Sequence, residues 1–456
     1  MHVGASRCPV RLACRNLPAS VGVNSGMITR RSLLAALAAP IVAPITRAVA
    51  DDEGPGKKPA VFANLFPEPT GTNGYEDIIR AGELVDTIED EYHRRVNGKV
   101  PLAKRREYLA HPASREAASL LRRGIAKPIT VAEQDPFAED MYAPFALLRA
   151  LARLLSDEIY VSLADGRTDV AVRVASEGLT LSHPFKSVSV ISSLVARAMD
   201  AIVLAPLVRQ RDGWSVRDCR FLIRLSERWL AVPDPATVAL TVERATLLRM
   251  LGRWREKPDD WADLLVKQHT PYTEGESETE GESETPELRR ARDFARSLRT
   301  DGILRERLLR EMADAIRSHF DRAEGLLRDP TGRMILTPAT NNGDHYMLPF
   351  LRQTFLSEAR ATVQRSIEGR VSLQLLAVHA GIRAFRWEND RLPKSLDQLQ
   401  LAANLVTDPF TGKLLVYEPE SDTNGYDLAS AGAFYPGKDG KPDARERITL
   451  PWTLPK

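Results

Sequence analysis

Apolar side chains recur at helical spacing from Tyr75 to about residue 330, and this periodicity restricts the chain to a mainly α-helical fold. One stripe, with intervals of three and four residues, consists of Leu148, Leu151, Leu155 and Ile159. An earlier stripe consists of Ile78, Ile79, Leu84, Val85 and Ile88. Each stripe must be buried against another helix, because apolar surface left in water is unfavourable. We therefore predict a helical domain over residues 75–330.

The clearest supersecondary unit is a pair of helices predicted over 142–163 and 168–180. Gly166 can adopt the left-handed conformation that ends the first helix, and Thr168 is expected to cap the second. A turn this short makes the two helices antiparallel neighbours. The pair resembles a degenerate tetratricopeptide-type hairpin, although no second copy follows at the ~34-residue period of that repeat.

Further helices are predicted over 187–209, 215–231, 236–256 and from Pro286 to about Arg328. Between the last two, residues 273–285 form a tandem hexapeptide with an acid at every second position and no apolar residue. Such a segment cannot bury enough surface to offset its ordering entropy, so we predict a disordered acidic loop there. The sequence Asp329-Pro330-Thr331-Gly332 predicts a turn that ends the helical domain.

The first fifty residues have the layout of an export signal. They hold six arginines and no acid, and Thr29-Arg30-Arg31 precedes an apolar run over 33–45 that is too short for a comfortable membrane span. Ala48-Val49-Ala50 then provides small residues before Asp51. The pattern resembles signal peptides of the twin-arginine type, which makes Met27 a candidate start and residues 1–26 an upstream extension.

We therefore expect residues 1–50 to be a leader, 51–74 a flexible spacer, and the mature protein to be periplasmic or extracellular, with no stable membrane span after cleavage. An uncleaved anchor helix is the alternative. Beyond Ala50 the chain has 57 basic and 61 acidic residues, a net charge of −4, which argues against nucleic acid as the main partner. Only Cys219 remains after processing, so no intramolecular disulfide is expected.

Common catalytic signatures are absent from the sequence. It contains no Gly-x-Ser-x-Gly elbow, no His-Glu-x-x-His, no phosphate-binding glycine loop, no Cys-x-x-Cys pair and no dinucleotide fingerprint. Glu89 and His93 lie four residues apart on one helical face, as a metal pair would, but two ligands are too few for a zinc site. We interpret the pair as part of a solvated helix face.

Two polar segments are candidates for chemistry near the C-terminus. Asp344 beside His345 has the composition of an acid–base pair, although turn formation alone explains the surrounding Asn341-Asn342-Gly343. Oxygen ligands for calcium can be drawn from Asp427, Asp439 and Asp443, although the last two lie among exposed turn residues with two lysines. We assign no catalytic, metal or cofactor-binding residue and predict no cofactor.

The segment from about 354 to 440 begins with a long amphipathic helix and continues into short elements rich in turn and strand residues. Its pieces include Ala384-Phe385-Arg386, Arg391-Leu392-Pro393, Asp408-Pro409-Phe410-Thr411-Gly412-Lys413 and Tyr426-Asp427-Leu428-Ala429-Ser430-Ala431-Gly432. In order and spacing they resemble the globular domain of protein G-type pseudopilins of type II secretion systems. The resemblance implies a small α+β module, which we place at 354–456.

The departures from that family affect the functional expectation. The long helix carries charged residues, including Arg360, Arg365, Glu368 and Arg370, so it cannot span a bilayer as a pilin helix does. The segment Phe434-Tyr435-Pro436-Gly437-Lys438 lies between Gly432 and Asp439, so the calcium loop of the family is rearranged. Filament assembly is therefore not expected.

The whole chain resembles uncharacterised exported proteins of planctomycete-like bacteria. We expect a non-enzymatic binding or scaffold protein of the cell envelope with a protein or peptide partner. A hydrolase with an unrecognised site and an accessory component of a type II secretion-like apparatus are the alternatives.

Overall fold

The computed structural model describes residues 71–92, 100–131, 143–269, 285–331, 357–420, 425–435, 444–445 and 447–450. Within them the protein is mainly helical, with a small three-stranded antiparallel sheet near the C-terminus, which confirms the predicted fold class at this level. The leader 1–50, the spacer up to residue 70 and the acidic loop up to residue 284 lie outside the described residues.

The helices are α3 (Gly74–Tyr92), α4 (Leu102–Ala110), α5 (Pro112–Ile125), α6 (Ala143–Ala164), α7 (Thr168–Ser182), α8 (Val190–Gln210), α9 (Val216–Ala231), α10 (Ala236–Glu256), α11 (Pro258–His269), α12 (Pro286–Thr300), α13 (Gly302–Arg328), α15 (Ser357–Asn389) and α16 (Ala403–Val406). Short 3₁₀ turns are η1 (His183–Ser187), η2 (Arg211–Gly213) and η4 (Leu396–Leu399). The strands are β1 (Val416–Pro419), β2 (Tyr426–Ser430), β3 (Phe434–Tyr435), β4 (Ala444–Arg445) and β5 (Ile448–Thr449).

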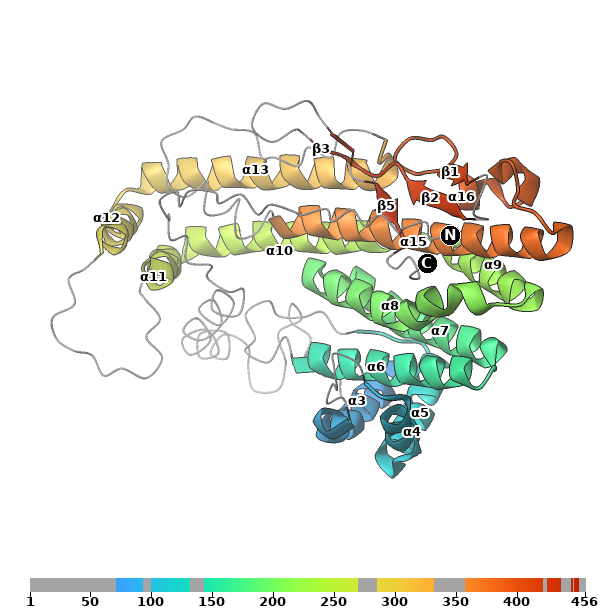
Figure 1. Ribbon diagram of the computed structural model, residues 1–456. Helices are drawn as coiled ribbons and strands as arrows, with labels where there is room; N and C mark the ends of the chain where they lie inside the picture. The colour runs from blue at the N-terminus through green and yellow to red at the C-terminus, as the bar shows by residue number, and fades with distance from the viewer. Residues whose placement is uncertain are drawn as a thin grey trace, which may run out of the picture.

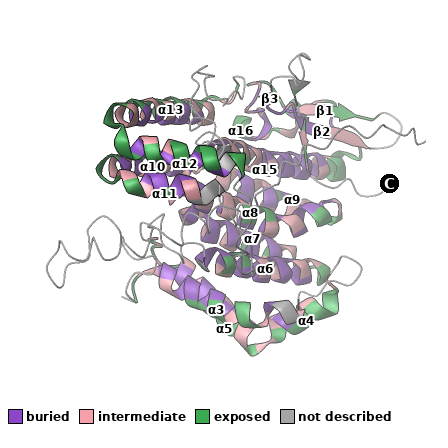
Figure 2. Ribbon diagram, turned by 90° about the vertical axis from the view of Figure 1, so that its left-hand side faces the viewer, coloured by how far each residue is buried: buried purple, intermediate pink, exposed green. Residues whose placement is uncertain are grey.

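The helices from α3 to α9 form a stack that follows chain order (Figure 1). Helices α3, α4 and α5 lie at one end, α6 packs on them, and α7 and α8 pack on α6. Helix α15 then packs against α8 and α9, while α13 and the three-stranded sheet lie on its other side. Buried residues are concentrated along α6, α7, α8 and α15, whereas α4 is mostly exposed (Figure 2).

The hairpin of α6 and α7 closes through a glycine turn, as the sequence predicts. Gly166 has φ +70°, and the Arg167 N–H donates to Ser162 O at 2.8 Å, which is the bond that marks a glycine-terminated helix end. The prediction for Thr168 is wrong. Thr168 is the first residue of α7, and Arg167 occupies the N-cap position without a side-chain hydrogen bond. The turn between α6 and α7 is so short that the residue after Gly166 is already the N-cap.

The predicted helices over 187–209, 215–231 and 236–256 are confirmed as α8, α9 and α10 with nearly the same bounds. Helix α8 begins at Val190 because η1 occupies the preceding residues and Ser189 Oγ caps the Ser192 N–H. Helix α9 begins with a capping box in which Ser215 and Asp218 accept from each other's backbone N–H groups.

The helical stretch predicted from Pro286 to Arg328 is two helices. Asp301 separates α12 from α13, and its carboxylate accepts from the Ile303 and Leu304 N–H groups, so it caps α13. The predicted turn after α13 is present, where Asp329 Oδ1 accepts from the Thr331 N–H at 3.1 Å. Gly332 lies outside the described residues.

Helix α15 carries two separate apolar stripes. One stripe belongs to the core that α3–α9 form and consists of Leu373, Leu376, Ala377, Ala380 and Ala384. The other belongs to the core that α10–α13 and the C-terminal elements form and consists of Ala359, Val363, Ile367, Val371, Leu375, Val378 and Ile382. One helix therefore contributes to both of the hydrophobic cores that the described residues form.

The C-terminal sheet has the order β1-β2-β5, with Val416 opposite Ala429 and Ser430 opposite Ile448. Asp408 attaches the preceding turn to the end of β2. Its buried carboxylate accepts from the Phe410 N–H at 2.8 Å, the Ala431 N–H at 2.6 Å and the Ser430 hydroxyl at 3.1 Å. A fully buried carboxylate requires several such donors.

One described segment, Val190–Gly213, is long and apolar enough to cross a membrane by composition. It comprises α8 and η2 and is more than half buried, with contacts to α6, α7 and α15. We interpret it as a core helix of the stack.

The contact between α3 and α6 provides a test of the stacked arrangement. A Cβ atom on Gly82 would lie 2.6 Å from the Leu147 Cβ, so Gly82→Ala forces the two helices apart. We expect this change to lower the free energy of unfolding by roughly 1–3 kcal/mol in denaturant titration. Gly252→Ala is the matched control, because a Cβ atom there meets open space and alanine favours helix by about 1 kcal/mol. Equal stability of both variants would contradict the packing of α3 on α6.

Candidate functional site

Of the residues singled out from the sequence as candidates for chemistry, the structure describes Glu89 on α3 and Asp427 on β2. Glu89 lies on α3 and is buried, where its carboxylate pairs with Arg153 of α6, so its interpretation as part of a solvated face is wrong. The apolar stripe of α3 faces α6, which brings Glu89 into that interface. His93 lies outside the described residues.

The other two candidates are only partly described. Asp344 and His345, with the surrounding 341–346 segment, lie outside the described residues, as do Asp439 and Asp443. Asp427 lies on β2, and its Oδ2 is 3.1 Å from the Arg447 Nη1, so a cation already neutralises it. No group of three or more potential metal-ligating side chains occurs among the described residues.

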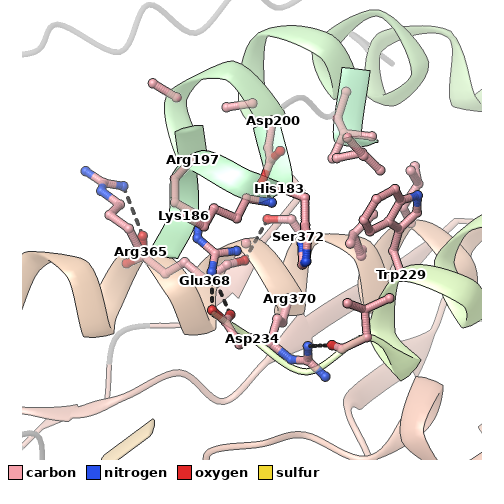
Figure 3. A pocket seen from close by; sticks show the side chains of 18 of the residues that line it. His183, Lys186, Arg197, Asp200, Trp229, Asp234, Arg365, Glu368, Arg370 and Ser372 are labelled. Carbon is pink, nitrogen blue, oxygen red and sulfur yellow. Dashed lines mark hydrogen bonds and ion pairs between the residues drawn. The ribbon is translucent and has the colours of Figure 1, made fainter. Parts of the chain in front are cut away.

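A cavity of about 610 Å³ lies where α7, α8, the end of α9 and α15 meet. The connection from α9 to α10 and Leu450, next to β5, complete its lining. Figure 3 shows the polar side chains of this cavity converging from η1, α8 and α15. The exposed residues of its lining, Ala198, Ala201, Pro233 and Arg365, mark its mouth.

Helix α8 supplies two charges to the cavity. Arg197 and Asp200 are the only ionisable residues between Val190 and Val208, and both line the cavity one helical turn apart. Burial of charge in an otherwise apolar helix is costly unless each charge has a partner. Their partners come from other elements of the fold.

Arg197 connects three parts of the chain. Its Nη2 lies 2.5 and 2.6 Å from the two Asp234 carboxylate oxygens and donates to the Ser366 hydroxyl of α15 at 3.1 Å. Asp234 also accepts from the Ser366 hydroxyl and from the Ala236 N–H at the start of α10. The network therefore fixes α8, α10 and α15 around one end of the cavity.

The second pair joins η1 to α8. Lys186 Nζ lies 2.7 Å from Asp200 Oδ2, and the side chain of Lys186 is only 6% exposed. The Ser182 hydroxyl donates to the other oxygen of Asp200. Burial lowers the pKa of Lys186, although Asp200 opposes that effect. His183, beside it, also has a lowered pKa because of burial and the Lys186 charge.

Burial raises the pKa of Asp234, but Arg197, the Ser366 hydroxyl and the Ala236 N–H lower it by more, so the net shift is downward. Asp234 is therefore held as a carboxylate. Arg370 has a different environment. Its Nη2 and Nη1 donate to the Leu230 and Val232 carbonyls at 2.7 and 3.1 Å, so it caps the C-terminal end of α9.

Apolar side chains line the rest of the cavity. They come from α7, α8, α9, α15 and the C-terminal segment and include Leu179, Leu204, Val208, Trp229, Leu373, Leu376 and Leu450. The cavity thus combines a charged region with an apolar one, which is the composition of small-molecule sites in proteins. Its three carboxylates already pair with cations, Asp200 with Lys186, Asp234 with Arg197 and Glu368 with Arg365. Such fixed pairs favour binding and orientation of a ligand.

A second polar cluster lies where the sheet meets α15. His379 is buried, its Nε2 lies 3.3 Å from Asp212 Oδ1, and its Nδ1 shares a hydrogen bond with the Tyr426 hydroxyl of β2. The contact of Nε2 with Asp212 is electrostatic, since Nε2 makes no hydrogen bond to the described residues. The ring also meets Trp214 edge-on at 6.2 Å. This cluster connects η2, α15 and β2.

Sequence reasoning missed the cavity. The available signal was the pair of charges inside the apolar run of α8, together with Arg365, Glu368 and Arg370 on the long C-terminal helix. The second set indicates from the sequence alone only that this helix does not span a bilayer. Nothing in the sequence indicated that residues 197–200 and 365–370 would face each other.

Comparison with known protein families gives no match, and comparisons with curated proteins and with solved structures give none that is significant. The function must therefore be argued from the cavity itself.

The cluster around His379 predicts a pH dependence of stability. Burial lowers the pKa of His379, although Asp212 opposes the effect, so the unfolded chain binds the proton first as pH falls below about 6.5. We expect the free energy of unfolding to fall between about pH 7 and about pH 5, by at most about 1.4 kcal/mol per pH unit for this group. His379→Gln should reduce the slope in denaturant titrations across that range. An unchanged slope would show that His379 is not the source of this pH dependence and would point to His183, whose pKa is also lowered.

Proposed function

We propose that the protein is an exported, non-enzymatic binding protein of the bacterial cell envelope and that the cavity between α7, α8, α9 and α15 is its ligand site. The observation that carries the proposal is the cavity of about 610 Å³, which has charged and apolar regions and an exposed mouth. Its volume lies within the range of small-molecule sites. A peptide partner would place one side chain there.

The buried ion pairs support binding over catalysis. Arg197 and Lys186 are each engaged by a carboxylate from another part of the fold, so their positions are fixed before a ligand arrives. Preorganised groups lower the entropic cost of binding. The sequence signatures of the common hydrolases are also absent.

The finer architecture is part of the proposal. The glycine-closed hairpin of α6 and α7 within a stack of helices supports a tetratricopeptide-like body. A long helix with a small antiparallel sheet supports a pseudopilin-like C-terminal module. The leader pattern over residues 27–50 supports export by the twin-arginine route.

The two alternatives remain predictions. A hydrolase would use Asp344 and His345, and its activity would disappear when both are replaced by alanine. An accessory component of a secretion apparatus would co-purify with pseudopilins. The described residues hold no feature that favours either over ligand binding.

Binding of the uncharged fluorescent probe Nile red tests the proposed site. We expect saturable binding to the full protein, because the apolar region of the cavity excludes water from such a probe. Ala201→Trp fills the mouth from an exposed position that tolerates a large side chain, and should weaken binding by roughly tenfold or more. The affinity is measured by fluorescence titration.

Ala110→Trp is the matched control, since Ala110 is the exposed last residue of α4 and does not line the cavity. It should bind the probe as the unmodified protein does. If the probe does not bind, or if both tryptophan variants bind it with unchanged affinity, the cavity is not the ligand site.

A further inference from the structure

Two of the helices that line the cavity, α8 and α15, run in the same direction. Thr362 of α15 lies beside Val190 of α8, with its hydroxyl 3.5 Å from the Val190 carbonyl oxygen. Further along, Ser366 contacts Arg197, and the two pairs keep the same order in the chain. At the far end His379 lies 3.3 Å from Asp212, just after α8. Successive residues along α8, one wall of the cavity, therefore lie beside successive residues along α15, the other wall.

Both walls change from charged to apolar in that common direction. On α8, Arg197 and Asp200 follow Leu194, and beyond them the larger lining side chains, Leu204 and Val208, are apolar. On α15, residues 365–370 carry the charges, and Leu373 and Leu376 follow. The cavity therefore has a charged end and an apolar end, separated along its length.

The charged end has an excess of positive charge. Four cationic side chains line the cavity, against three carboxylates, which are Asp200, Asp234 and Glu368. Each carboxylate is paired, and the recorded partners of Arg370 among the described residues are the two backbone carbonyls at the end of α9. The guanidinium of Arg370 therefore keeps a full positive charge with no carboxylate bound to it in the described part of the chain.

The charged end of the cavity also contains a hydrogen-bond donor without a partner among the described residues, the Nε of Arg197. Arg197 has a side chain that is 10% exposed, and its buried Nε makes no hydrogen bond to the described residues. A buried donor without a partner is unfavourable, which makes this end of the cavity short of acceptors. Lys186 has three donors, of which Asp200 engages one.

On these grounds we infer that the ligand is a single-chain amphiphile with an anionic head group, whose head binds at Arg370 and Arg197 and whose apolar tail lies toward Leu204 and Leu376. The inference rests on the proposed function and specifies the class of ligand. A carboxylate and a phosphate monoester both supply the required oxygen acceptors. A cationic head would meet like charge at Arg370, Arg197 and Lys186.

Competition against Nile red tests the head group. Decanoate, decyl phosphate, decanol and decyltrimethylammonium share one tail and differ in charge. Used below their micelle concentrations, the two anions should displace the probe at concentrations about tenfold lower than decanol does, and the ammonium compound should be the weakest. The better of the two anions identifies the carboxylate or the phosphate source.

Arg370→Gln should raise the concentration of each anion needed for displacement by about tenfold and leave decanol unchanged. Arg370→Lys, which keeps the charge and can still donate to the α9 carbonyls, should retain most of the preference for anions. Arg386→Gln is the control, because Arg386 is exposed on the same helix and does not line the cavity.

The inference would be overturned if decanol or the ammonium compound displaced the probe at the same concentrations as the anions do. The inference would also be overturned if Arg370→Gln raised the concentration needed for displacement equally for all four competitors, since that result assigns Arg370 a structural role only. In both cases Nile red would still bind, and the proposed site would stand. Failure of the probe and of every competitor to bind would instead remove the proposed function.

Discussion

The two apolar stripes of α15 are the constraint on which the rest of the structure depends. Leu376 packs with the core of α3–α9, and Leu375, the neighbouring residue, packs with the core of α10–α13 and the C-terminal elements. Because successive residues of a helix point in different directions, one helix can serve two cores only when apolar residues occupy both sides. Burial of both stripes fixes the rotation of α15 about its axis, and that rotation places Ser366 against Arg197 of α8.

The cavity follows from this arrangement. Ser366 contacts Arg197 of α8, Arg370 donates to the carbonyls at the end of α9, and Glu368 lines the cavity in an ion pair with Arg365 of its own helix. A well-packed set of apolar residues would be no less stable at such positions, so buried ion pairs are poor evidence of a stabilising role. They are better explained as groups that maintain a polar pocket next to apolar walls. This is the physical basis for proposing a binding protein with an amphiphilic ligand.

The sequence predicted what local physics determines. Helical spacing and Gly166 predicted α6 to α10 with bounds that agree within a few residues, and they predicted the span of α12 and α13 but not the break between them at Asp301. The cavity could not be predicted, because it depends on the contact between residues 197–200 and 365–370, which no local pattern encodes. Glu89 shows the same limit. Its spacing to His93 indicated one helical face, but only the packing of α3 on α6 decides that this face is buried.

Native-state hydrogen exchange of α15 tests the central role of this helix most directly. If α15 joins both cores, the amides of residues 371–382 should exchange only through global unfolding, with the same free energy of opening as the slowest amides of α8 and α10. Exchange of the α15 amides at a markedly lower free energy, or separate opening energies for α8 and α10, would show that the two cores are independent and would contradict the account.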